Sequence, residues 1–345
     1  MSDNSSVLVI YTGGTIGMKA DASLGGALKP FDFSQILDEV PELREFAVSI
    51  DSVSFTPFID SSDITTEHWC KLAEVIRNNY DSYDGFVVLH GTDTMAYSAS
   101  ALSFMLENLA KPVVFTGSQL PIGVPRTDGR ENLISAIEIA SAKCPDGSAR
   151  VPEVCVCFGS TLMRGNRTVK ESADNFDAFR SPNLDALARA GISIRYNDAV
   201  IRKWNGKPLE VHAELDTSVS ILKIYPGITE NVVRSLLLDG KTKAVIIETY
   251  GAGNAPSSQW FLDLVRQSAD SGKLLVNVTQ CPAGNVDMSL YATGRKMQEA
   301  GVISGGDSTT EAMLAKLYYL LGLDLDLCEC KRLLAESLRG EITLA

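Results

Sequence analysis

The sequence predicts an α/β fold, with a larger N-terminal doubly wound domain built on a mainly parallel sheet and a smaller C-terminal α/β domain. Short β-branched runs alternate with amphipathic stretches along most of the chain. This alternation is typical of parallel strands covered by helices on both faces. The length of 345 residues also exceeds what one hydrophobic core usually serves, since domains commonly have about 100 to 200 residues.

The N-terminal part shows the clearest alternation, and we assign residues 1–190 to the first domain. Residues 191–216 are irregular and polar, with turn-forming pairs such as Asn205-Gly206, so we interpret them as the interdomain linker. Strands are predicted at residues 7–11, 53–57, 85–89, 112–116 and 154–158, and helices at residues 66–79, 96–108 and 130–142.

The alternation resumes after the linker, and we assign residues 217–345 to the smaller domain. The same periodicity argument predicts a smaller α/β domain. Strands are predicted at residues 219–225, 244–250 and 274–279, and helices at residues 229–237, 258–269, 310–321 and 327–337.

Composition and charge limit the function. Hydrophobic residues make up 45% of the chain and charged residues 21%, as in an ordinary globular protein. The net charge of −12 disfavours nucleic-acid binding, which depends on Lys and Arg contacts to phosphates. No apolar run approaches the ~18 residues that span a bilayer, and the first residues do not resemble a signal peptide. We therefore expect a cytoplasmic protein that acts on a small molecule and binds neither nucleic acid nor membranes.

The seven cysteines and three histidines are not arranged as a metal site. Cys155 and Cys157 alternate inside an apolar run and are interpreted as core residues. An odd number of cysteines argues against a disulfide framework. The cysteine pairs lack zinc-ligand spacing and the histidines are scattered along the chain. We expect no metal and no cofactor.

Hydroxyl and carboxylate residues follow four successive predicted strands. In an open parallel sheet, ligands bind outside the carboxyl ends of the strands. These side chains should therefore gather along one edge of the sheet. The four segments are TGGTIG at residues 12–17, FIDSSD at residues 58–63, HGTDTM at residues 90–95 and GSQLP at residues 117–121.

Thr15 is the candidate nucleophile of the first segment. Gly13 and Gly14 permit backbone conformations that are closed to residues with a Cβ, so the chain can turn sharply and expose the threonine. A tight turn without any chemistry explains the same pattern equally well. Phosphate binding is disfavoured, because the GxGxxG and GxxxxGK[ST] spacings are missing.

Thr92 and Asp93 are ambiguous when residue types alone are considered. A hydroxyl beside a carboxylate at a strand end can bind a substrate, but it can also cap the following helix. The segment at residues 60–63 has the same ambiguity, and Asp63 is a candidate cap for the helix that follows Thr65. Both interpretations stay open at this point.

Two further features can be interpreted either as functional or as purely structural. The segment RGNRTVK at residues 164–170 offers a basic partner for the carboxylates, or else forms a solvated loop. His90 ends an apolar strand, and although histidine is a common general base, a hydrogen-bonded structural histidine is the favoured interpretation.

Taken together, the segments resemble the L-asparaginases, most closely their intracellular type I branch. The resemblance covers nearly the whole chain and implies a larger doubly wound domain followed by a smaller one. It also implies an amidohydrolase that converts L-asparagine to L-aspartate and ammonia. The matching segments are TGGTIG around Thr15, HGTDTMAY at residues 90–97, DSSD at 60–63, ALSFMLENL at 101–109, RGNR at 164–167, YGAGNAP at 250–256 and LRGE at 338–341.

The resemblance implies roles for four catalytic residues. Thr15 matches the family's first threonine and would form a covalent acyl-enzyme. Thr92, Asp93 and Lys170 match the family's threonine, aspartate and lysine set, in which the lysine beside a threonine hydroxyl manages proton transfer. Burial would favour a neutral lysine and the nearby aspartate a charged one. The sequence leaves that balance open.

The substrate-binding residues are likewise implied by the resemblance. Asp93 would hold the ammonium group of the amino acid, Ser61 and nearby backbone N–H groups its carboxylate, and Ser118 would line the amide end. Glutamine differs by one methylene, which is worth roughly 1 to 3 kcal/mol, so minor glutaminase activity is expected. The full implied set is Asp60, Ser61, Ser62, Thr92, Asp93 and Ser118.

The chain departs from the family pattern in two places. Many members carry a tyrosine on the lid after the first threonine, whereas residues 18–29 contain none. Gly25 and Gly26 still suit a flexible lid. Val169 and Glu248 replace the threonine and arginine of a regulatory asparagine site found in some bacterial type I members, so we expect that site to be lost. The family assembles as homodimers, often paired into homotetramers, and a dimer at least is expected.

Two other functions compete with this interpretation. The amidotransferase subunit that acts on glutamate charged to tRNA shares the catalytic domain, although the acidic charge balance is poor for binding tRNA. A catalytically silent asparagine-binding sensor is suggested by the missing lid tyrosine. Ammonia release from asparagine separates the sensor from an enzyme.

Overall fold

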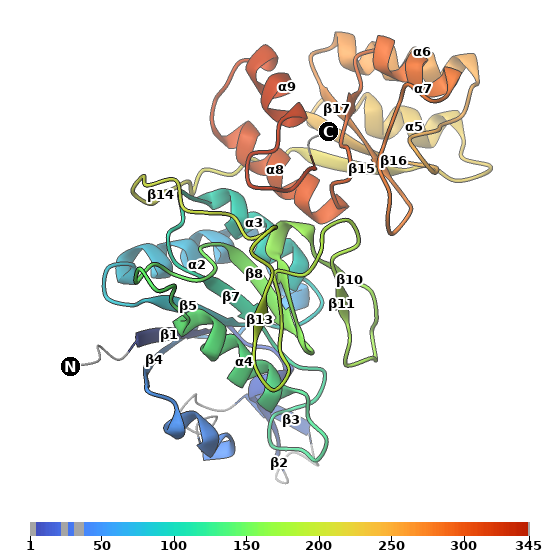
Figure 1. Ribbon diagram of the computed structural model, residues 1–345. Coiled ribbons are helices and arrows are strands. Elements are labelled where there is room, and N and C mark those ends of the chain that lie inside the picture. Colours follow the sequence, from blue (N-terminus) through green and yellow to red (C-terminus); the bar gives the residue numbers. More distant parts are fainter. Residues whose placement is uncertain (1–4, 22–26, 31–37, 344–345) are drawn as a thin grey trace. The chain divides into compact units, whose positions relative to one another are not determined.

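The computed structural model describes residues 5–21, 27–30 and 38–343, with side chains omitted for residues 19–21 and 27–30 (Figure 1). The chain divides into two compact units, Met1–Ala213 and Glu214–Ala345. Each unit is α/β, so the predicted fold class is confirmed. The finer boundaries at residues 190, 191–216 and 217 stay a prediction.

The N-terminal unit is built on an eight-stranded sheet with the order β13-β12-β9-β8-β7-β5-β1-β4. The five strands from β4 to β8 are parallel, and the remaining three run antiparallel to their neighbours. The strands are β1 (Ser5–Tyr11), β4 (Val48–Ser54), β5 (Gly85–Leu89), β7 (Val113–Thr116), β8 (Val154–Phe158), β9 (Thr161–Arg164), β12 (Ala188–Arg189) and β13 (Arg195–Tyr196).

The strand order creates a switch point between β1 and β5. From β1 the chain moves outward to β4, and it then returns to the other side of β1 to form β5, β7 and β8. Connections on either side of a switch point leave in opposite directions, which opens a crevice at the carboxyl ends of the two strands. The loops after β1 and β5 lie at this switch point.

Helices cover both faces of the parallel strands (Figure 1). The side chains of β1 alternate between the faces, and all of its residues from Val7 to Tyr11 are buried. Helix α4 (Gly129–Ser141) packs with the odd-numbered residues of β1 in one core cluster. Figure 1 shows α2 (Thr66–Asn79) and α3 (Met95–Met105) on the other side of the sheet.

Two predicted elements of the N-terminal unit end three residues away from the predicted position. The second strand was expected at residues 53–57 but covers Val48–Ser54. It is an edge strand whose residues are mostly exposed or half-buried, so its sequence lacks the apolar run of a central strand. The helix expected to reach residue 108 ends at Met105, because Leu106 and Glu107 form β6, which pairs with β14 (Glu210–Val211).

The N-terminal unit has two further short pairs of antiparallel strands outside the main sheet. The first joins β2 (Met18–Asp21) and β3 (Ala27–Pro30), and the second joins β10 (Val169–Lys170) and β11 (Phe179–Arg180). Gly25 and Gly26, the expected hinges of a lid, lie outside the described residues. Three 3-10 turns matter for the site or its surroundings: η1 (Thr15–Gly17), η4 (Ser61–Asp63) and η5 (Gly165–Arg167).

The C-terminal unit contains a four-stranded parallel sheet. Helices α5 to α7 share one core cluster with its strands. A buried ion pair between Lys316 and Glu341, at 2.7 Å, ties α8 to the end of the chain. The strands are β15 (Val219–Lys223), β16 (Ala244–Thr249), β17 (Leu274–Thr279) and β18 (Ile303–Ser304), and the helices are α5 (Glu230–Leu237), α6 (Gln259–Asp270), α7 (Ala292–Glu299), α8 (Thr310–Gly322) and α9 (Leu327–Ala335).

The sequence did not predict α7 and β18. Helix α7 buries only Gly294 and Met297, which is too little to give an apolar stripe at helical spacing. Strand β18 has two residues, both half-buried. In the described part of the chain, every helix is too short or too polar to cross a bilayer.

Candidate active site

The loop after β1 turns sharply and packs against two neighbouring loops. Gly13 and Gly14 have φ values of 143° and 93°, which other residues rarely adopt. A Cβ on Gly13 would lie 2.2 Å from the carbonyl oxygen of Ile59, and one on Gly14 would lie 2.6 Å from the backbone nitrogen of Gly91. The glycines therefore let the loop touch the loops that follow β4 and β5.

Thr15 follows this close contact directly. It is the first residue of η1 and is half-buried, whereas Ile16 and Gly17 are buried. The turn is fixed by the buried Tyr11 hydroxyl, which donates to the Gly17 carbonyl at 2.9 Å. Burial raises the pKa of Tyr11, so the phenol keeps its proton and stays a donor. Sequence reasoning missed this tyrosine, because it reads as the last core residue of a strand.

The loop after β5 places Thr92 and Asp93 beside Lys170. The Lys170 ammonium donates to the Thr92 hydroxyl at 2.9 Å and to the Asp93 carboxylate at 2.6 Å. Lys170 comes from β10, and its side chain is 19% exposed, against 64% for Asp93. The lysine is thus largely enclosed while its carboxylate partner still faces solvent. This contact joins three of the four predicted catalytic residues.

Gln119, which the sequence did not single out, contacts the Thr92 hydroxyl. Thr92 donates to the Gln119 side-chain oxygen at 3.5 Å. The Gln119 amide group donates in turn to the backbone carbonyl of Asn175 at 3.0 Å, which directs the accepting oxygen toward Thr92. The three side chains form a chain of donors from Lys170 through Thr92 to Gln119. The signal for this residue was its place in the loop after the fourth strand.

Asp128 holds the loop that carries Gln119. Its carboxylate accepts from the backbone N–H groups of Gln119 at 3.0 Å and Leu120 at 3.2 Å. Asp128 precedes α4 but does not cap that helix with its side chain. Ser118 is buried and donates to the Leu120 carbonyl at 2.5 Å. Its proton is therefore committed within the loop, and only its lone pairs can face a ligand.

The segment after β4 is organised around Asp60. The Asp60 carboxylate accepts from the backbone N–H of Ser62 at 3.0 Å and from its hydroxyl at 2.9 Å. Ser61 is buried, and its hydroxyl lies against Gly91, since a Cβ on that glycine would be 2.4 Å from it. Asp60, Ser61 and Ser62 were all predicted to bind substrate, and of these Ser61 is the one that packs against the loop of Thr92.

The predicted cap at Asp63 is wrong. Helix α2 begins after Thr65, whose backbone N–H donates to the His68 ring nitrogen at 3.0 Å in a capping box. Asp63 lies inside the turn η4 instead. Two threonines at residues 65 and 66 offered a competing cap position, and sequence alone could not choose between them.

The alternative of a solvated loop for residues 164–170 is also wrong. Arg164, Asn166 and Arg167 are all buried. The Arg164 guanidinium pairs with the buried Glu153 carboxylate at 2.5 Å. This enclosed segment leads directly into β10 and so fixes the backbone of Lys170.

His90 is buried and hydrogen-bonded, as expected for a structural residue. One ring nitrogen lies 2.7 Å from the Gly91 carbonyl and the other 2.9 Å from the Ser98 hydroxyl. Trp69 donates to that hydroxyl at 2.8 Å, so the serine's own proton points to the histidine. Burial lowers the pKa of His90 to about 4. A neutral ring with both nitrogens occupied is a poor general base.

One group of side chains in the described part of the chain has the composition of a metal site. Ligand atoms of Glu107, Glu210 and His212 all lie within 4.8 Å of one another. The His212 ring nitrogen and the Glu107 carboxylate already lie 2.9 Å apart, so a hydrogen bond accounts for these two members of the cluster. The expectation of no metal and no cofactor stays a prediction.

Comparison with known proteins adds an independent finding. Residues 6–202 match the family model described as asparaginase, N-terminal, and residues 218–334 match the glutaminase/asparaginase C-terminal domain. The chain is 46% identical to L-asparaginase 1 of Escherichia coli over 342 residues, which cover 98% of each chain. It is 34% identical to a glutamyl-tRNA(Gln) amidotransferase polypeptide of Pyrococcus abyssi, covering 98% of this chain and 76% of that one.

Solved structures give the same result. The crystal structure of L-asparaginase I from Vibrio cholerae superposes with a TM-score of 0.88. The two chains are 42% identical, and the match covers 99% of each. The similarity therefore includes both units.

Proposed function

The chain belongs to the asparaginase family, and from this premise we propose that it hydrolyses L-asparagine to L-aspartate and ammonia through an acyl-enzyme on Thr15. The observation that carries the proposal is the contact of Lys170 with both Thr92 and Asp93 beside the switch-point crevice. Gly14, next to Thr15, packs against the same loop. The alternatives from sequence have less support, since the amidotransferase relative is 34% identical and the asparaginase relative 46%.

In the proposed first step, the Thr15 hydroxyl oxygen attacks the side-chain amide carbon of asparagine. The hydroxyl proton passes to the Lys170–Thr92 pair, which returns a proton to the leaving nitrogen so that ammonia departs. Water then attacks the ester on Thr15 and releases aspartate. Lys170 can accept a proton only after its ammonium has released one to solvent, and a second cation beside Asp93 favours that release.

The substrate's own ammonium group is that cation. Asp93 is exposed enough to bind it while one carboxylate oxygen contacts Lys170. We propose that the buried Ser61 hydroxyl and neighbouring N–H groups hold the substrate carboxylate and that Ser118 borders the amide end. Asp60 and Ser62 are hydrogen-bonded to each other, so we propose that they stabilise the conformation of this loop.

Cellular context and assembly also belong to the proposal. We propose a cytoplasmic homodimer or homotetramer with no cofactor, and size-exclusion chromatography with light scattering measures the assembly. The regulatory asparagine site is proposed to be absent. Glu248, at the position of the regulatory arginine, accepts from Thr310 at 2.7 Å and lies 3.4 Å from Lys223.

Steady-state ammonia release from asparagine, run beside glutamine, tests the proposed function. The expected result is turnover of asparagine with a slower reaction on glutamine. Binding of asparagine without turnover would favour the sensor instead. Tight tRNA binding at physiological salt, together with no turnover of free asparagine, would favour the amidotransferase.

A further inference from the structure

Besides the candidate active site, the N-terminal unit contains a second pocket. The candidate active site lies at the carboxyl ends of the parallel strands, called here the carboxyl edge, and the second pocket lies at their amino ends, the amino edge. It has a volume of about 710 Å³. Its lining includes residues one or two positions before three parallel strands: Asp84 before β5, Lys111 before β7 and Pro152 before β8. The pocket therefore opens at the amino ends of strands whose carboxyl ends border the site of Thr92.

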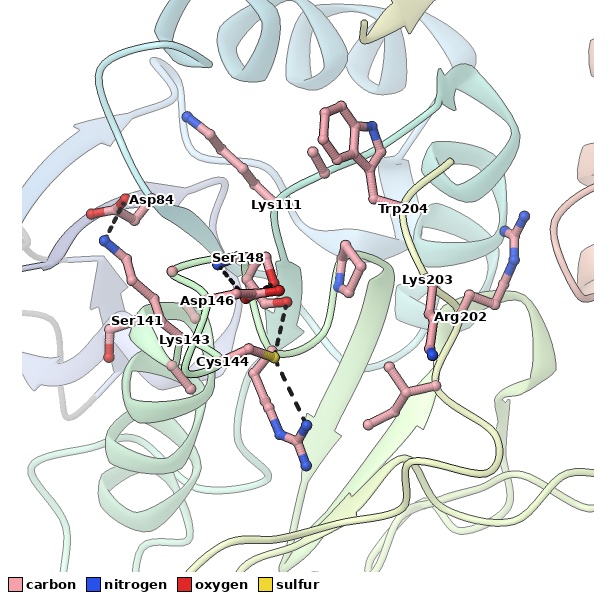
Figure 2. Close-up of a pocket in the computed structure, with 18 of the residues that line it drawn as sticks. Asp84, Lys111, Ser141, Lys143, Cys144, Asp146, Ser148, Arg202, Lys203 and Trp204 are labelled. Atoms are coloured by element: carbon pink, nitrogen blue, oxygen red, sulfur yellow. Dashed lines mark hydrogen bonds and ion pairs between the residues drawn. The ribbon is translucent and has the colours of Figure 1, made fainter. Parts of the chain in front are cut away.

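The pocket has an excess of positive charge in a chain whose net charge is −12. Five basic side chains and three carboxylates line it. Figure 2 shows Lys143 on one side, Lys203 on the other, and Lys111 and Trp204 along a third. The five basic residues are Lys111, Lys143, Arg150, Arg202 and Lys203, and the acidic ones are Asp84, Asp146 and Asp198.

The carboxylates of the pocket are already satisfied. Asp146 accepts from the Ser148 hydroxyl at 2.6 Å and from its backbone N–H at 3.0 Å. The other two carboxylates form ion pairs with bases of the same pocket. The pairs are Asp84 with Lys143 at 3.0 Å and Asp198 with Arg150 at 2.8 Å.

Two ion pairs leave three basic side chains and Asp146 charged, so five basic minus three acidic side chains give the lining a net charge of +2. The Lys111 ammonium donates to the backbone carbonyls of Tyr80 and, at 2.7 Å, Tyr83. Carbonyl groups satisfy its hydrogens but leave its unit charge. Lys203 is exposed and can reach a bound anion without breaking an ion pair. Such a site attracts a negatively charged group.

A flat aromatic surface lies beside these cations. Trp204 is 49% exposed, and its ring nitrogen donates to the Lys207 carbonyl at 2.8 Å, which restrains the indole. The rest of the lining contains many small side chains, among them Ala110, Ala142 and Ala149. These leave room for a planar ring to stack on the tryptophan.

Hydrogen bonds from buried side chains hold the backbone of the segment that carries Trp204. The Glu153 carboxylate accepts from the backbone N–H of Arg202 at 2.6 Å and pairs with Arg164. Arg164 also donates to the Val200 carbonyl at 2.6 Å. The segment 200–204 is therefore ordered before any ligand arrives, which lowers the entropic cost of binding.

We propose that this pocket binds an organic anion that carries a flat ring, of the size of a nucleoside monophosphate. The ring lies on Trp204, and the anionic group faces Lys203, while Lys111 adds its charge to the field of the pocket from another side. The volume falls in the range of about 300 to 1,000 Å³ that is typical of small-molecule sites. The proposal does not depend on the asparaginase reaction.

Isothermal titration calorimetry on the full chain tests it with three probes: AMP, adenosine and inorganic phosphate. AMP should bind more tightly than either fragment, because only AMP presents both the ring and the anion. Saturating L-aspartate should leave AMP binding unchanged, since the two sites lie at opposite edges. Absence of AMP binding, or displacement of AMP by aspartate, would overturn the proposal.

Two exposed substitutions locate the ligand. Trp204→Ala should weaken AMP roughly fivefold or more, because stacking contributes about 1 to 3 kcal/mol, and should leave phosphate unaffected. Lys203→Glu should weaken AMP and phosphate by at least roughly threefold and spare adenosine. Lys296→Glu, with the same charge change at an exposed position of α7 in the C-terminal unit, is the control. Equal AMP affinity in the wild type and both pocket variants would contradict the assignment.

Discussion

The two edges of the N-terminal sheet each hold a lysine–aspartate ion pair. At the carboxyl edge, Lys170 contacts Asp93 at 2.6 Å, and at the amino edge Lys143 contacts Asp84 at 3.0 Å. Among the described contacts, only Lys170 also donates to a threonine hydroxyl. An ion pair can support ligand binding at either edge. The threonine hydroxyl beside the Lys170 pair is what suits the carboxyl edge to acyl transfer.

Helix α4 runs between the two edges. Asp128, just before its first residue, holds the Gln119 loop, and Ser141 at its end lines the second pocket. Thirteen residues at the helical rise make it roughly 20 Å long. The two sites are therefore separate, and a variant of one should leave the other intact.

Thr15→Ala should produce the largest effect. Removing the proposed nucleophile should lower kcat on asparagine by roughly 10³-fold or more, with AMP binding at the other edge unchanged. Thr15→Ser, which keeps a hydroxyl, should retain part of the activity. Near-normal turnover in the alanine variant would remove Thr15 as nucleophile.

Lys170→Met should follow, with kcat lowered by roughly 10²- to 10⁴-fold, because it removes the group that exchanges protons with Thr92. Lys243→Met is the matched control. That lysine pairs with Asp216 at 2.7 Å on the C-terminal unit, so its loss should leave ammonia release within about twofold, as expected for an exposed pair. Equal losses in both variants would mean that the Lys170 effect is not specific.

His90 should make the stability of the carboxyl edge depend on pH. Its pKa is lowered to about 4 in the folded protein, below the ordinary value near 6.5 of an unfolded chain. The stability is fully present above that ordinary value and is lost as the pH falls toward 4, because the unfolded state binds the proton first. The loss amounts to roughly 3 kcal/mol.

Urea unfolding at several pH values measures this loss, and His90→Gln should reduce the slope between pH 6.5 and 4. A wild-type slope in the His90 variant would assign the pH dependence to other groups.

Gln119→Leu should produce the smallest effect. It removes the acceptor of the Thr92 hydroxyl, a single hydrogen bond worth about 0.5 to 1.5 kcal/mol, so kcat should fall about two- to tenfold. Gln259→Leu removes a comparable exposed contact with Asp263 and should not change turnover. An unchanged rate in Gln119→Leu would show that Thr92 needs no acceptor there.

The fold and the carboxyl edge could be anticipated because strand ends are visible in the sequence. Alternation of apolar runs with helical stretches located β1, β5, β7 and β8, and each loop that follows carries polar residues. The contact of Lys170 with Asp93 spans 77 positions. Residue types offered the segment 164–170 as a basic partner, but only the resemblance to a family singled out Lys170. Local sequence patterns cannot reveal a contact between residues that lie so far apart in the chain.

The amino edge could not be anticipated. Its pocket is assembled from the ends of α4 and three strands together with the segment around Trp204, and no single segment has a motif. The bounds of the edge strand β4 were misplaced and helix α7 was missed for a related reason, since exposed or weakly buried elements lack an apolar period. Sequence reasoning was strongest where burial is continuous and weakest where long-range assembly creates the feature.

A crystal structure of the protein with L-aspartate would show whether the proposed nucleophile and the Lys170–Thr92 pair share one substrate. We expect the side-chain carboxylate of aspartate between the hydroxyls of Thr15 and Thr92, with the ammonium group on Asp93. Aspartate bound beyond the reach of the Thr15 hydroxyl would contradict the proposed reaction.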